Sequence, residues 1–525
     1  MNRGRLIRFS VFEVDLDSGE LFKQGRKVKL QDQPFELLLA LLDRPGEVVT
    51  REELKRKVWP SDTVVDFEHG LNRAINKVRE ALGDSAESPC FIETLPRRGY
   101  RFIGSIQESS GAEPSPVHNG AGVARPEEGF WVAVLPFKCG ANFDLAALAG
   151  GITDDIVTGL ARFSYLRVIS RSSTARYAGE VPDLRSAGKE LGARYLIEGN
   201  IRKAGAVLRF AAQLIDTDSG AELWAETYDR PFRPKAGFEL QDDIVPRIVS
   251  TIADTQGVLP HSMSEALRNR DPGELSPYEA VLRSFAHFRR LNAGEHAGAR
   301  AALERAVQQA PGQADCWAML SMLYREEYAH EFNVRPDPLG RALAAARHAV
   351  EAAPSNHLAY HALASTLFFR REFQAFRHAA ERAIELNPMD GFAAGYLGFM
   401  IAYAGDWERG CALARYSMMR LNPHYPGWYW FPCFFDAYRK GDYRGALEIA
   451  PKINMPGFWR TQVALAAVYG QLGDKEAAGN AVRELLAIKP DFAVAARTEL
   501  RKWWDAELTE HLLDGLRKAG LEVAL

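Results

Sequence analysis

One segment near the start of the chain combines an apolar stripe with hydrogen-bond donors on its opposite side. From Asp66 to Leu82, apolar residues recur at helical spacing, which predicts a helix with one buried face. That face comprises Leu71, Ala74, Ile75, Val78 and Leu82. The residues projecting away from it are of types that donate hydrogen bonds to base edges and phosphates, and they are His69, Asn72, Arg73, Asn76, Lys77 and Arg79.

A second basic feature follows this helix. The runs Phe91–Thr94 and Tyr100–Ile103 alternate in polarity and predict a hairpin, and its turn carries Arg97 and Arg98. A helix with a few basic residues is usually only a solvated face, so neither feature is specific by itself. Their succession favours one surface that contacts DNA.

The elements that must position these residues are also visible. Short alternating runs between residues 6 and 30 predict a small antiparallel sheet. A helix is predicted from Pro34 to Leu42, and Thr50 followed by Glu53 forms a capping box for a second helix that ends before Pro60. The sequence therefore predicts sheet, helix, helix, helix and hairpin in that order.

In this order, the motifs QPFELLLALL, VVTREELKRKVWP, VDFEHGLNRAINKVREALGD and FIETLPRRGYRF resemble the OmpR/PhoB-type winged-helix domain of bacterial transcription regulators, and we assign residues 1–106 to it. The resemblance implies an α+β winged helix-turn-helix whose third helix lies in the major groove of double-stranded DNA while the hairpin, or wing, reaches the adjacent backbone or minor groove.

The resemblance also implies roles for single residues. Base or phosphate contacts fall to Asn72, Arg73, Asn76 and Lys77, a phosphate contact or structural support to Arg79, and wing contacts to Arg97 and Arg98. Gly99 and Tyr100 are expected to hold the shape of the wing. The loop before the third helix can face RNA polymerase, and its residues are Trp59, Pro60, Ser61, Asp62 and Thr63.

Two further regions follow a linker that is rich in Pro, Gly and Ser, residues 107–128. Residues 129–260 alternate predicted strands and helices, which indicates an α/β domain with a mixed sheet. The phrases VAVLPF, GGITDDIVTGLARF and AGKELGARYLIEGNIRKAG resemble a TolB-like domain. No chemistry is shared across that fold, so no site residue follows from the resemblance.

The C-terminal region shows an internal repeat. From Tyr278 onward prolines recur at intervals mostly close to the 34 residues of a tetratricopeptide repeat, at Pro311, Pro354, Pro388, Pro423, Pro456 and Pro490. The longer interval after Pro311 indicates an insertion at residues 330–338. We predict an all-α solenoid of roughly six repeats over residues 276–525.

Such a solenoid presents a concave face that suits a peptide or protein partner, and self-association into a homo-oligomer is an alternative. One stretch of the repeats is unusually aromatic, and we predict that part of it lines a groove or an interface, the alternative being a heavily packed core. It comprises Trp428, Tyr429, Trp430, Phe431, Phe434 and Phe435.

Composition limits the remaining hypotheses. A formal net charge of −3 gives no overall attraction to nucleic acid, so a DNA surface must come from local arrangement. No metal site and no cofactor are expected, because the five cysteines lack ligand spacing; they are Cys90, Cys139, Cys316, Cys411 and Cys433. No signal peptide and no apolar stretch of about 20 residues is visible, so we expect a cytoplasmic protein without a membrane anchor.

The leading hypothesis is a one-component transcription regulator whose C-terminal region senses a ligand or partner. The alternative is a scaffold that acts mainly through protein contacts of the repeats. A catalytic hypothesis would use Gly150–Gly151 before a helix and the pair Asp154–Asp155. We do not expect an enzyme, because Gly-Gly before a helix is usually turn chemistry and the sequence contains no Walker A, GxSxG or HExxH motif.

Overall fold

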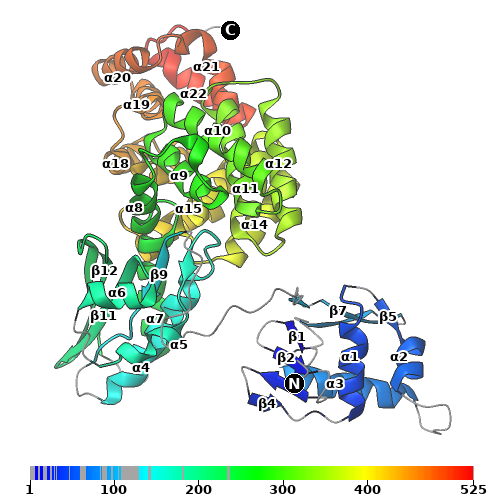
Figure 1. The fold of residues 1–525 in the computed structure, drawn as a ribbon. Helices are drawn as coiled ribbons and strands as arrows, with labels where there is room; N and C mark the ends of the chain where they lie inside the picture. Colours follow the sequence, from blue (N-terminus) through cyan, green and yellow to red (C-terminus); the bar gives the residue numbers. More distant parts are fainter. Residues whose placement is uncertain are drawn as a thin grey trace. The chain divides into compact units, whose positions relative to one another are not determined.

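The computed structural model describes residues 6–9, 12–15, 20–23, 26–28, 30, 32–46, 48–58, 67–82, 84, 91–95, 98–103, 106–107, 129–139, 143–179, 183–232 and 237–523. It divides the chain into two compact units, Met1–Ala121 and Gly122–Leu525 (Figure 1).

The first unit begins with the predicted antiparallel sheet. Its strands run in the order β4-β3-β2-β1-β8. They are β1 (Leu6–Phe9), β2 (Phe12–Asp15), β3 (Glu20–Lys23), β4 (Arg26–Val28) and β8 (Ile106–Gln107). Sequence patterns missed β8, because a strand of two residues is too short to show alternation.

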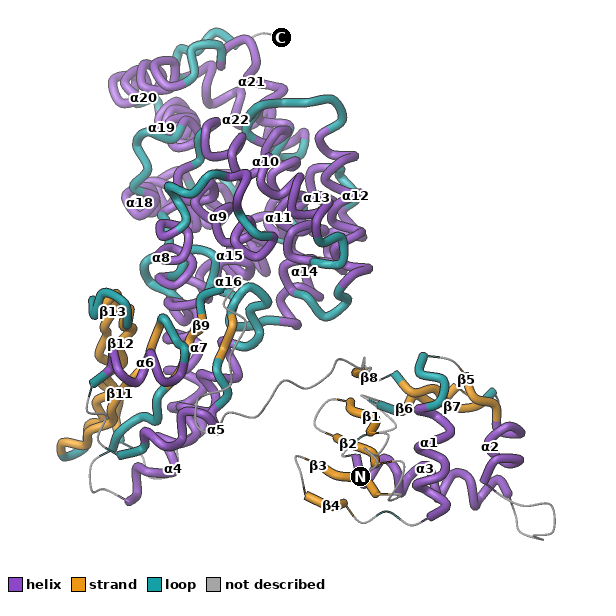
Figure 2. The backbone as a smooth tube through the Cα atoms, viewed as in Figure 1, coloured by secondary structure: helices purple, strands orange, loops and turns teal. Residues whose placement is uncertain are grey.

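Three helices and a second sheet complete this unit (Figure 2). The helices are α1 (Asp32–Leu42), α2 (Arg51–Val58) and α3 (Phe67–Leu82), and the sheet has the order β5-β7-β6, with β5 (Val48–Thr50), β6 (Ile92–Leu95) and β7 (Gly99–Phe102). The predicted capping box is present, since the Glu53 N–H donates to the Thr50 hydroxyl at 3.3 Å and the Thr50 N–H donates to the Glu53 carboxylate at 2.8 Å. The Glu53 carboxylate also accepts from the Thr50 hydroxyl at 2.7 Å, and the two bonds that it accepts from Thr50 lower the pKa of Glu53 to about 2.

The second unit opens with the predicted mixed sheet, whose strand order is β10-β9-β11-β12-β13. The strands are β9 (Trp131–Val134), β10 (Arg167–Val168), β11 (Tyr195–Ala204), β12 (Val207–Asp216) and β13 (Glu222–Pro231). The pairs that involve β9 are parallel, and the pairs that involve β12 are antiparallel.

Helices cover both faces of this sheet around β9. Val132 and Val134 share a core with α4 (Phe143–Leu160) and α7 (Gly237–Ala253), whereas Ala133 and Leu135 face α6 (Leu184–Leu191). The short helices α5 (Arg171–Thr174) and η1 (Ala175–Tyr177) follow β10. This alternation gives the segment three layers.

The expectation that Gly150–Gly151 precedes a helix is wrong, because both residues lie inside α4. The neighbouring carboxylates pair within the fold: Asp154 with Arg171, and Asp155 with the Gln241 amide at 2.9 Å. The apolar pattern of α4 extends without a break across the two glycines, so the helix begins before them.

The remainder of the second unit is helical. Between residues 277 and 518 consecutive helices pack in seven pairs, one more than the roughly six repeats predicted. The paired helices are α9 (Pro277–Arg290), α10 (Ala293–Gln309), α11 (Ala314–Ala329), α12 (Pro338–Ala352), α13 (His357–Phe369), α14 (Phe373–Leu386), α15 (Gly391–Tyr403), α16 (Trp407–Tyr416), α17 (Phe431–Arg439), α18 (Tyr443–Ile453), α19 (Trp459–Leu472), α20 (Lys475–Ile488), α21 (Phe492–Arg501) and α22 (Ala506–Lys518). The predicted insertion at residues 330–338 corresponds to the connection between α11 and α12, residues 330–337, and to the first residue of α12.

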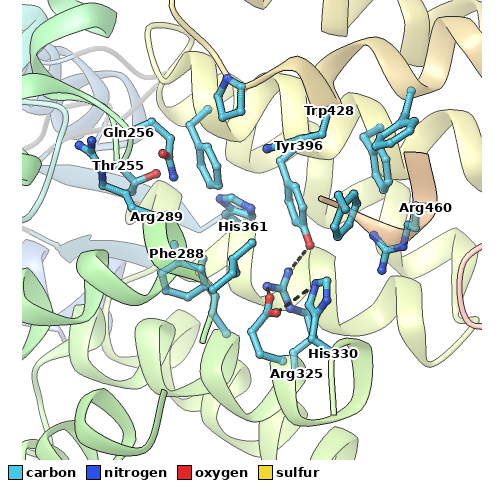
Figure 3. Close-up of a pocket in the computed structure, with 18 of the residues that line it drawn as sticks. Thr255, Gln256, Phe288, Arg289, Arg325, His330, His361, Tyr396, Trp428 and Arg460 are labelled. Carbon is cyan, nitrogen blue, oxygen red and sulfur yellow. Dashed lines mark hydrogen bonds and ion pairs between the residues drawn. The ribbon is translucent and has the colours of Figure 1, made fainter. Parts of the chain in front are cut away.

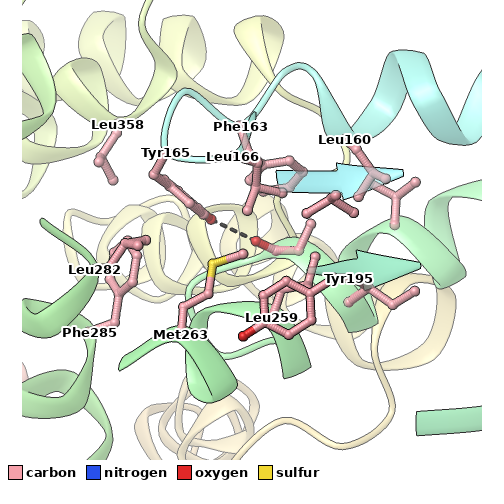
Figure 4. Packing of buried hydrophobic residues seen from close by; sticks show 14 of the residues in the cluster. Leu160, Phe163, Tyr165, Leu166, Tyr195, Leu259, Met263, Leu282, Phe285 and Leu358 are labelled. Atoms are coloured by element: carbon pink, nitrogen blue, oxygen red, sulfur yellow. Dashed lines mark hydrogen bonds between the residues drawn. The ribbon is translucent and has the colours of Figure 1, made fainter. Parts of the chain in front are cut away.

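One apolar core joins the sheet to the first repeats through α8 (Val258–Ala266) (Figure 4). Tyr165, which follows α4, packs against Phe285 of α9 and donates its hydroxyl to the Ala253 carbonyl at 2.8 Å. The boundary between residues 260 and 276 stays a prediction, and the core is continuous across it.

Across the described ranges, no helix has both the length and the apolar character that crossing a bilayer requires. Within the same ranges no group of His, Cys, Asp and Glu is arranged to hold a metal ion, and the cysteines found there are free thiols.

Candidate nucleic-acid interface

Helix α3 presents the predicted polar face to solvent. Its apolar stripe is buried, with Leu71 and Val78 fully inaccessible. On the opposite side Asn72, Arg73, Asn76 and Lys77 are exposed. Because these four lie at positions i, i+1, i+4 and i+5, they share one face of the helix.

Two of these residues have no competing partner. Among the residues that the structure describes, neither Arg73 nor Asn76 makes a side-chain hydrogen bond or ion pair. Lys77 pairs with Glu80 one turn later at 2.7 Å, and both side chains are more than half exposed. Such a surface pair contributes little free energy, so it does not hold Lys77 away from a phosphate.

Arg79 departs from the expectation that it projects away from the apolar stripe. It is only 6% exposed, and its Nη2 donates to the Ile92 carbonyl at 2.7 Å and to the Thr94 hydroxyl at 2.8 Å. Arg79 comes four residues after Ile75 and three before Leu82, which places it at the edge of the buried face. Of the two roles left open for it, this geometry fits structural support.

The wing is the hairpin of β6 and β7. Arg98 in its turn is exposed, and the Arg98 N–H donates to the Leu95 carbonyl at 3.0 Å. Gly99 is required by close packing, because a Cβ there would lie 2.1 Å from the Val49 carbonyl oxygen of β5. Arg97, the side chain of His69 and the loop Trp59–Thr63 lie outside the described residues.

Two polar connections hold the wing against α3. In the first, which we call the Tyr100 clamp, the Tyr100 hydroxyl donates to Asn72 Oδ1 at 2.8 Å, and Arg51 donates to both groups at 3.3 and 3.4 Å. In the second, the Arg79 clamp, Arg79 bonds to Ile92 and Thr94 of β6. The exposed face of α3 and the wing are therefore positioned together.

Arg51 was missed from the sequence, although a signal exists. It directly follows β5, whose Thr50 pairs with Gly99 of the wing, so the strand register places Arg51 opposite Arg98. Arg98 and Tyr100 are two residues apart on one strand and share a face, so Arg51 lies diagonally across from Tyr100. Its guanidinium carbon lies 5.2 Å from the centre of the Tyr100 ring. The Asn72 side-chain oxygen accepts from both Arg51 and Tyr100, so its two acceptor positions are used inside the domain.

Residues 25–102 match the family described as "Transcriptional regulatory protein, C terminal". The first unit carries an OmpR/PhoB-type winged helix. Residues 128–247 match "HilA/YgeH-like transcriptional regulator, second domain", and residues 460–492 match a tetratricopeptide repeat, which confirms the repeat prediction there. The resemblance of the middle segment to a TolB-like domain stays a prediction.

The chain is also similar in sequence to individual proteins. A protein of Rhizobium meliloti named "Putative adenylate cyclase 3" is 34% identical over 47% of this chain and 42% of its own length. The "Cholera toxin homolog transcriptional activator" of Vibrio parahaemolyticus is 36% identical over 19% of this chain and 35% of its own length. The chain thus spans less than half the length of these relatives.

Two more comparisons concern a transcriptional regulator and a DNA-binding domain. The "Transcriptional regulator HilA" of Salmonella typhimurium is 31% identical over 25% of this chain and 21% of its own length. The crystal structure of the Klebsiella pneumoniae RstA DNA-binding domain in complex with the RstA box shares 25% identity over 19% of this chain and 97% of that chain, with a TM-score of 0.17.

Proposed function

We propose that this protein is a sequence-specific, one-component DNA-binding transcription regulator. The observation that carries the proposal is the exposed donor face of α3, which two clamps hold beside a basic wing in a winged-helix domain. Relatives that share this domain are named transcriptional activators or regulators, which supports the same function here.

The residues divide into three roles. Arg73 and Asn76 are proposed to read bases or grip phosphates in the major groove, and Lys77 to contact a phosphate. Arg97 and Arg98 of the wing, with His69 on α3, are proposed to contact the adjacent backbone. Asn72 and Arg79 act chiefly by positioning, since their side chains bond within the domain.

For the rest of the chain we propose a supporting role rather than catalysis. The repeats bind a peptide or protein partner, and residues 59–63 face RNA polymerase as the winged-helix resemblance implies. The domain limits of 1–106, 129–260 and 276–525, joined by the linker 107–128, are part of this proposal.

The decisive experiment is selection of genomic fragments by the purified full-length chain. A triple variant, Arg73→Ala, Lys77→Ala and Arg98→Ala, removes charge from α3 and the wing. A matched control, Arg202→Ala, Arg444→Ala and Lys475→Ala, removes three exposed positive charges from the second unit. We expect the wild type and the control to enrich a shared motif and the triple variant to lose it.

Two other results would contradict the proposal, and the first would favour the scaffold hypothesis. If the wild type enriches no motif, sequence-specific binding is contradicted. If the triple variant folds, as judged by circular dichroism, and still enriches the motif, the interface is placed on the wrong residues.

A further inference from the structure

The second unit contains a cavity of about 170 Å³ among the repeats (Figure 3). Its lining comes from positions far apart in the sequence, from Thr255 just after α7 to Trp503 just after α21. Leu291 and Arg289 are exposed at its rim, while Arg325, Glu326 and Arg460 are buried. The cavity therefore has an accessible end and a deep, charged end.

Aromatic rings form much of the wall. The rings of Tyr396 and Phe399 are nearly parallel, at an interplanar angle of 4°, and the Trp428 indole stands at 90° and 86° to them. Trp428 and Phe431 belong to the aromatic stretch noted in the sequence, whereas Phe434 and Phe435 pack in the core. Each of the two expectations for that stretch thus holds for part of it.

The charged end contains Arg460, which forms no ion pair with any described residue. Arg460 is 5% exposed, and its Nε and Nη2 have no hydrogen-bond partner among the residues that the structure describes. Its guanidinium stacks on Trp503, with 3.5 Å between the guanidinium carbon and the ring centre. Burial lowers the pKa of Arg460 to about 10, so it carries its charge at neutral pH.

The remaining charges do not neutralise Arg460. Glu326 is the single carboxylate among the lining residues, and it pairs with Arg325, which also donates to the Tyr396 hydroxyl at 2.7 Å. Burial lowers the pKa of His330 to about 4 and that of His361 to about 3, so both imidazoles are neutral at pH 7. With Arg289 at the rim, the lining keeps an excess of positive charge.

We propose that this cavity binds a small organic anion composed of a flat aromatic ring and one acidic group. The acidic group, a carboxylate or a phosphate, pairs with Arg460, because an unpaired buried guanidinium is costly and forms its strongest bonds with these anions. The ring lies between the aromatic walls, and a cavity of this size suits one ring, since an engineered cavity of about 150 Å³ takes up benzene.

The site also joins two parts of the second unit. Thr255 and Gln256 follow the last helix of the α/β segment, whereas the other walls belong to the repeats. A bound anion would contact both and stabilise their association. This inference concerns the second unit alone and does not rest on the proposed DNA binding.

The test is isothermal titration of the full-length protein with phenylacetate, phenyl phosphate and the uncharged isostere phenylacetamide, supported by thermal melting. We expect saturable binding of at least one anion with a dissociation constant of about 1 mM or tighter, and much weaker binding of the amide. Which anion binds more tightly distinguishes carboxylate from phosphate.

Variants then locate the acidic group. We expect Arg460→Met to weaken anion binding about tenfold or more, Arg460→Lys to restore part of it, and the exposed control Arg444→Met to leave it unchanged. Arg289→Met, at the solvent-exposed rim, should weaken binding about threefold without threatening the fold.

Three outcomes would overturn the proposal. The first is the absence of saturable binding of either anion up to about 10 mM. The second is binding of phenylacetamide as tight as that of phenylacetate. The third is unchanged anion affinity in Arg460→Met, with folding verified by an unaltered melting transition.

Discussion

Arginine serves the two units of this protein in opposite environments. Arg73 in α3 lies exposed on a helix face, with no side-chain partner among the described residues. Arg460 in α19 is 5% exposed and stacked on Trp503, and it has no counterion within the described ranges. One environment suits an extended polyanion, and the other suits a single small anion enclosed by rings.

The difference has a measurable consequence. Exposed charges that neutralise DNA phosphates release counterions, so their affinity falls steeply as salt concentration rises. A charge inside a cavity is screened much less. Ionic strength should therefore separate the two kinds of anion recognition within one chain.

The largest expected effect is the pH dependence of stability that a buried carboxyl gives the second unit. Asp254 is fully buried and accepts bonds from the Ser250 hydroxyl at 3.0 Å, the Gln256 N–H at 2.9 Å and the Tyr425 hydroxyl. Burial, with the nearby Asp390, raises the pKa of Asp254 to about 7. A raised pKa means that its contribution to stability is fully present below the unfolded value of 3.8 and is lost as pH rises through 7.

Between pH 5 and pH 8 the wild type should lose about 3 kcal/mol more free energy of unfolding than Asp254→Asn loses. Tryptophan fluorescence during urea unfolding is a suitable measurement, because every tryptophan except Trp59 lies in the second unit. Asp242→Asn, an exposed position on α7, the helix that ends just before Asp254, should keep the wild-type pH dependence. If the free energy of unfolding changes equally with pH in the wild type and in Asp254→Asn, the prediction is wrong.

The next effect tests how far the exposed surface of the first unit depends on packing beneath it. Gly99→Ala would place a Cβ 2.1 Å from the Val49 carbonyl oxygen, so β5 and β7 must separate. We expect a loss of about 2 to 3 kcal/mol, seen as faster hydrogen exchange of α3 and β7 amides. Gly298→Ala, whose Cβ would meet nothing within 4 Å, is the control. Unchanged exchange in Gly99→Ala would show that the wing tolerates wider spacing.

The comparison of salt dependence is tested most directly at Arg73. Arg73→Ala should weaken binding to the selected motif by about 2 kcal/mol and reduce the magnitude of the salt slope by about 1 if the contact is to a phosphate. Fluorescence anisotropy over a salt series measures both quantities. Over the same salt series, the affinity of the cavity for its anion should stay nearly constant. If that affinity falls as steeply with salt as the affinity for DNA, the proposed difference between the two sites is wrong.

The smallest effect concerns the Tyr100 clamp. Tyr100→Phe removes the hydroxyl that donates to Asn72 and accepts from Arg51, which should cost the first unit about 1 kcal/mol. DNA affinity should fall severalfold, because Asn72 and the wing lose a shared anchor. Hydrogen exchange and anisotropy are the measurements, and wild-type values in both would mean that the clamp is dispensable.

The contrast between the units also explains what the sequence could reveal. Helix α3 was predictable because burial of Leu71, Ile75 and Val78 repeats every three to four residues, and a period of that kind survives in one sequence. Arg79 was placed wrongly because its length and charge suggest solvent, while its bonds to Ile92 and Thr94 depend on tertiary contact. Arg51 was overlooked for the same reason, since its role depends on the register of β5 against β7.

The cavity of the second unit could not be predicted from the sequence. Arg325 and Arg460 lie in ordinary helices and Trp503 in the turn after α21, and nothing local distinguishes them from surface or core residues. Their convergence depends on the stacking of repeats more than a hundred residues apart. Repeat periodicity predicts the helices, but not which of their side chains meet at the centre.

The two clamps between α3 and the wing have a consequence for the DNA. Bonded to each other at Asn72–Tyr100 and at Arg79–Thr94, helix and wing form a stiff template with a fixed separation between its two points of contact. A duplex that engages both must bring its major groove and the neighbouring backbone to that separation. Where the relaxed duplex does not match, the base steps between the contacts must bend or twist, so easily deformed steps would be selected at positions that no side chain touches.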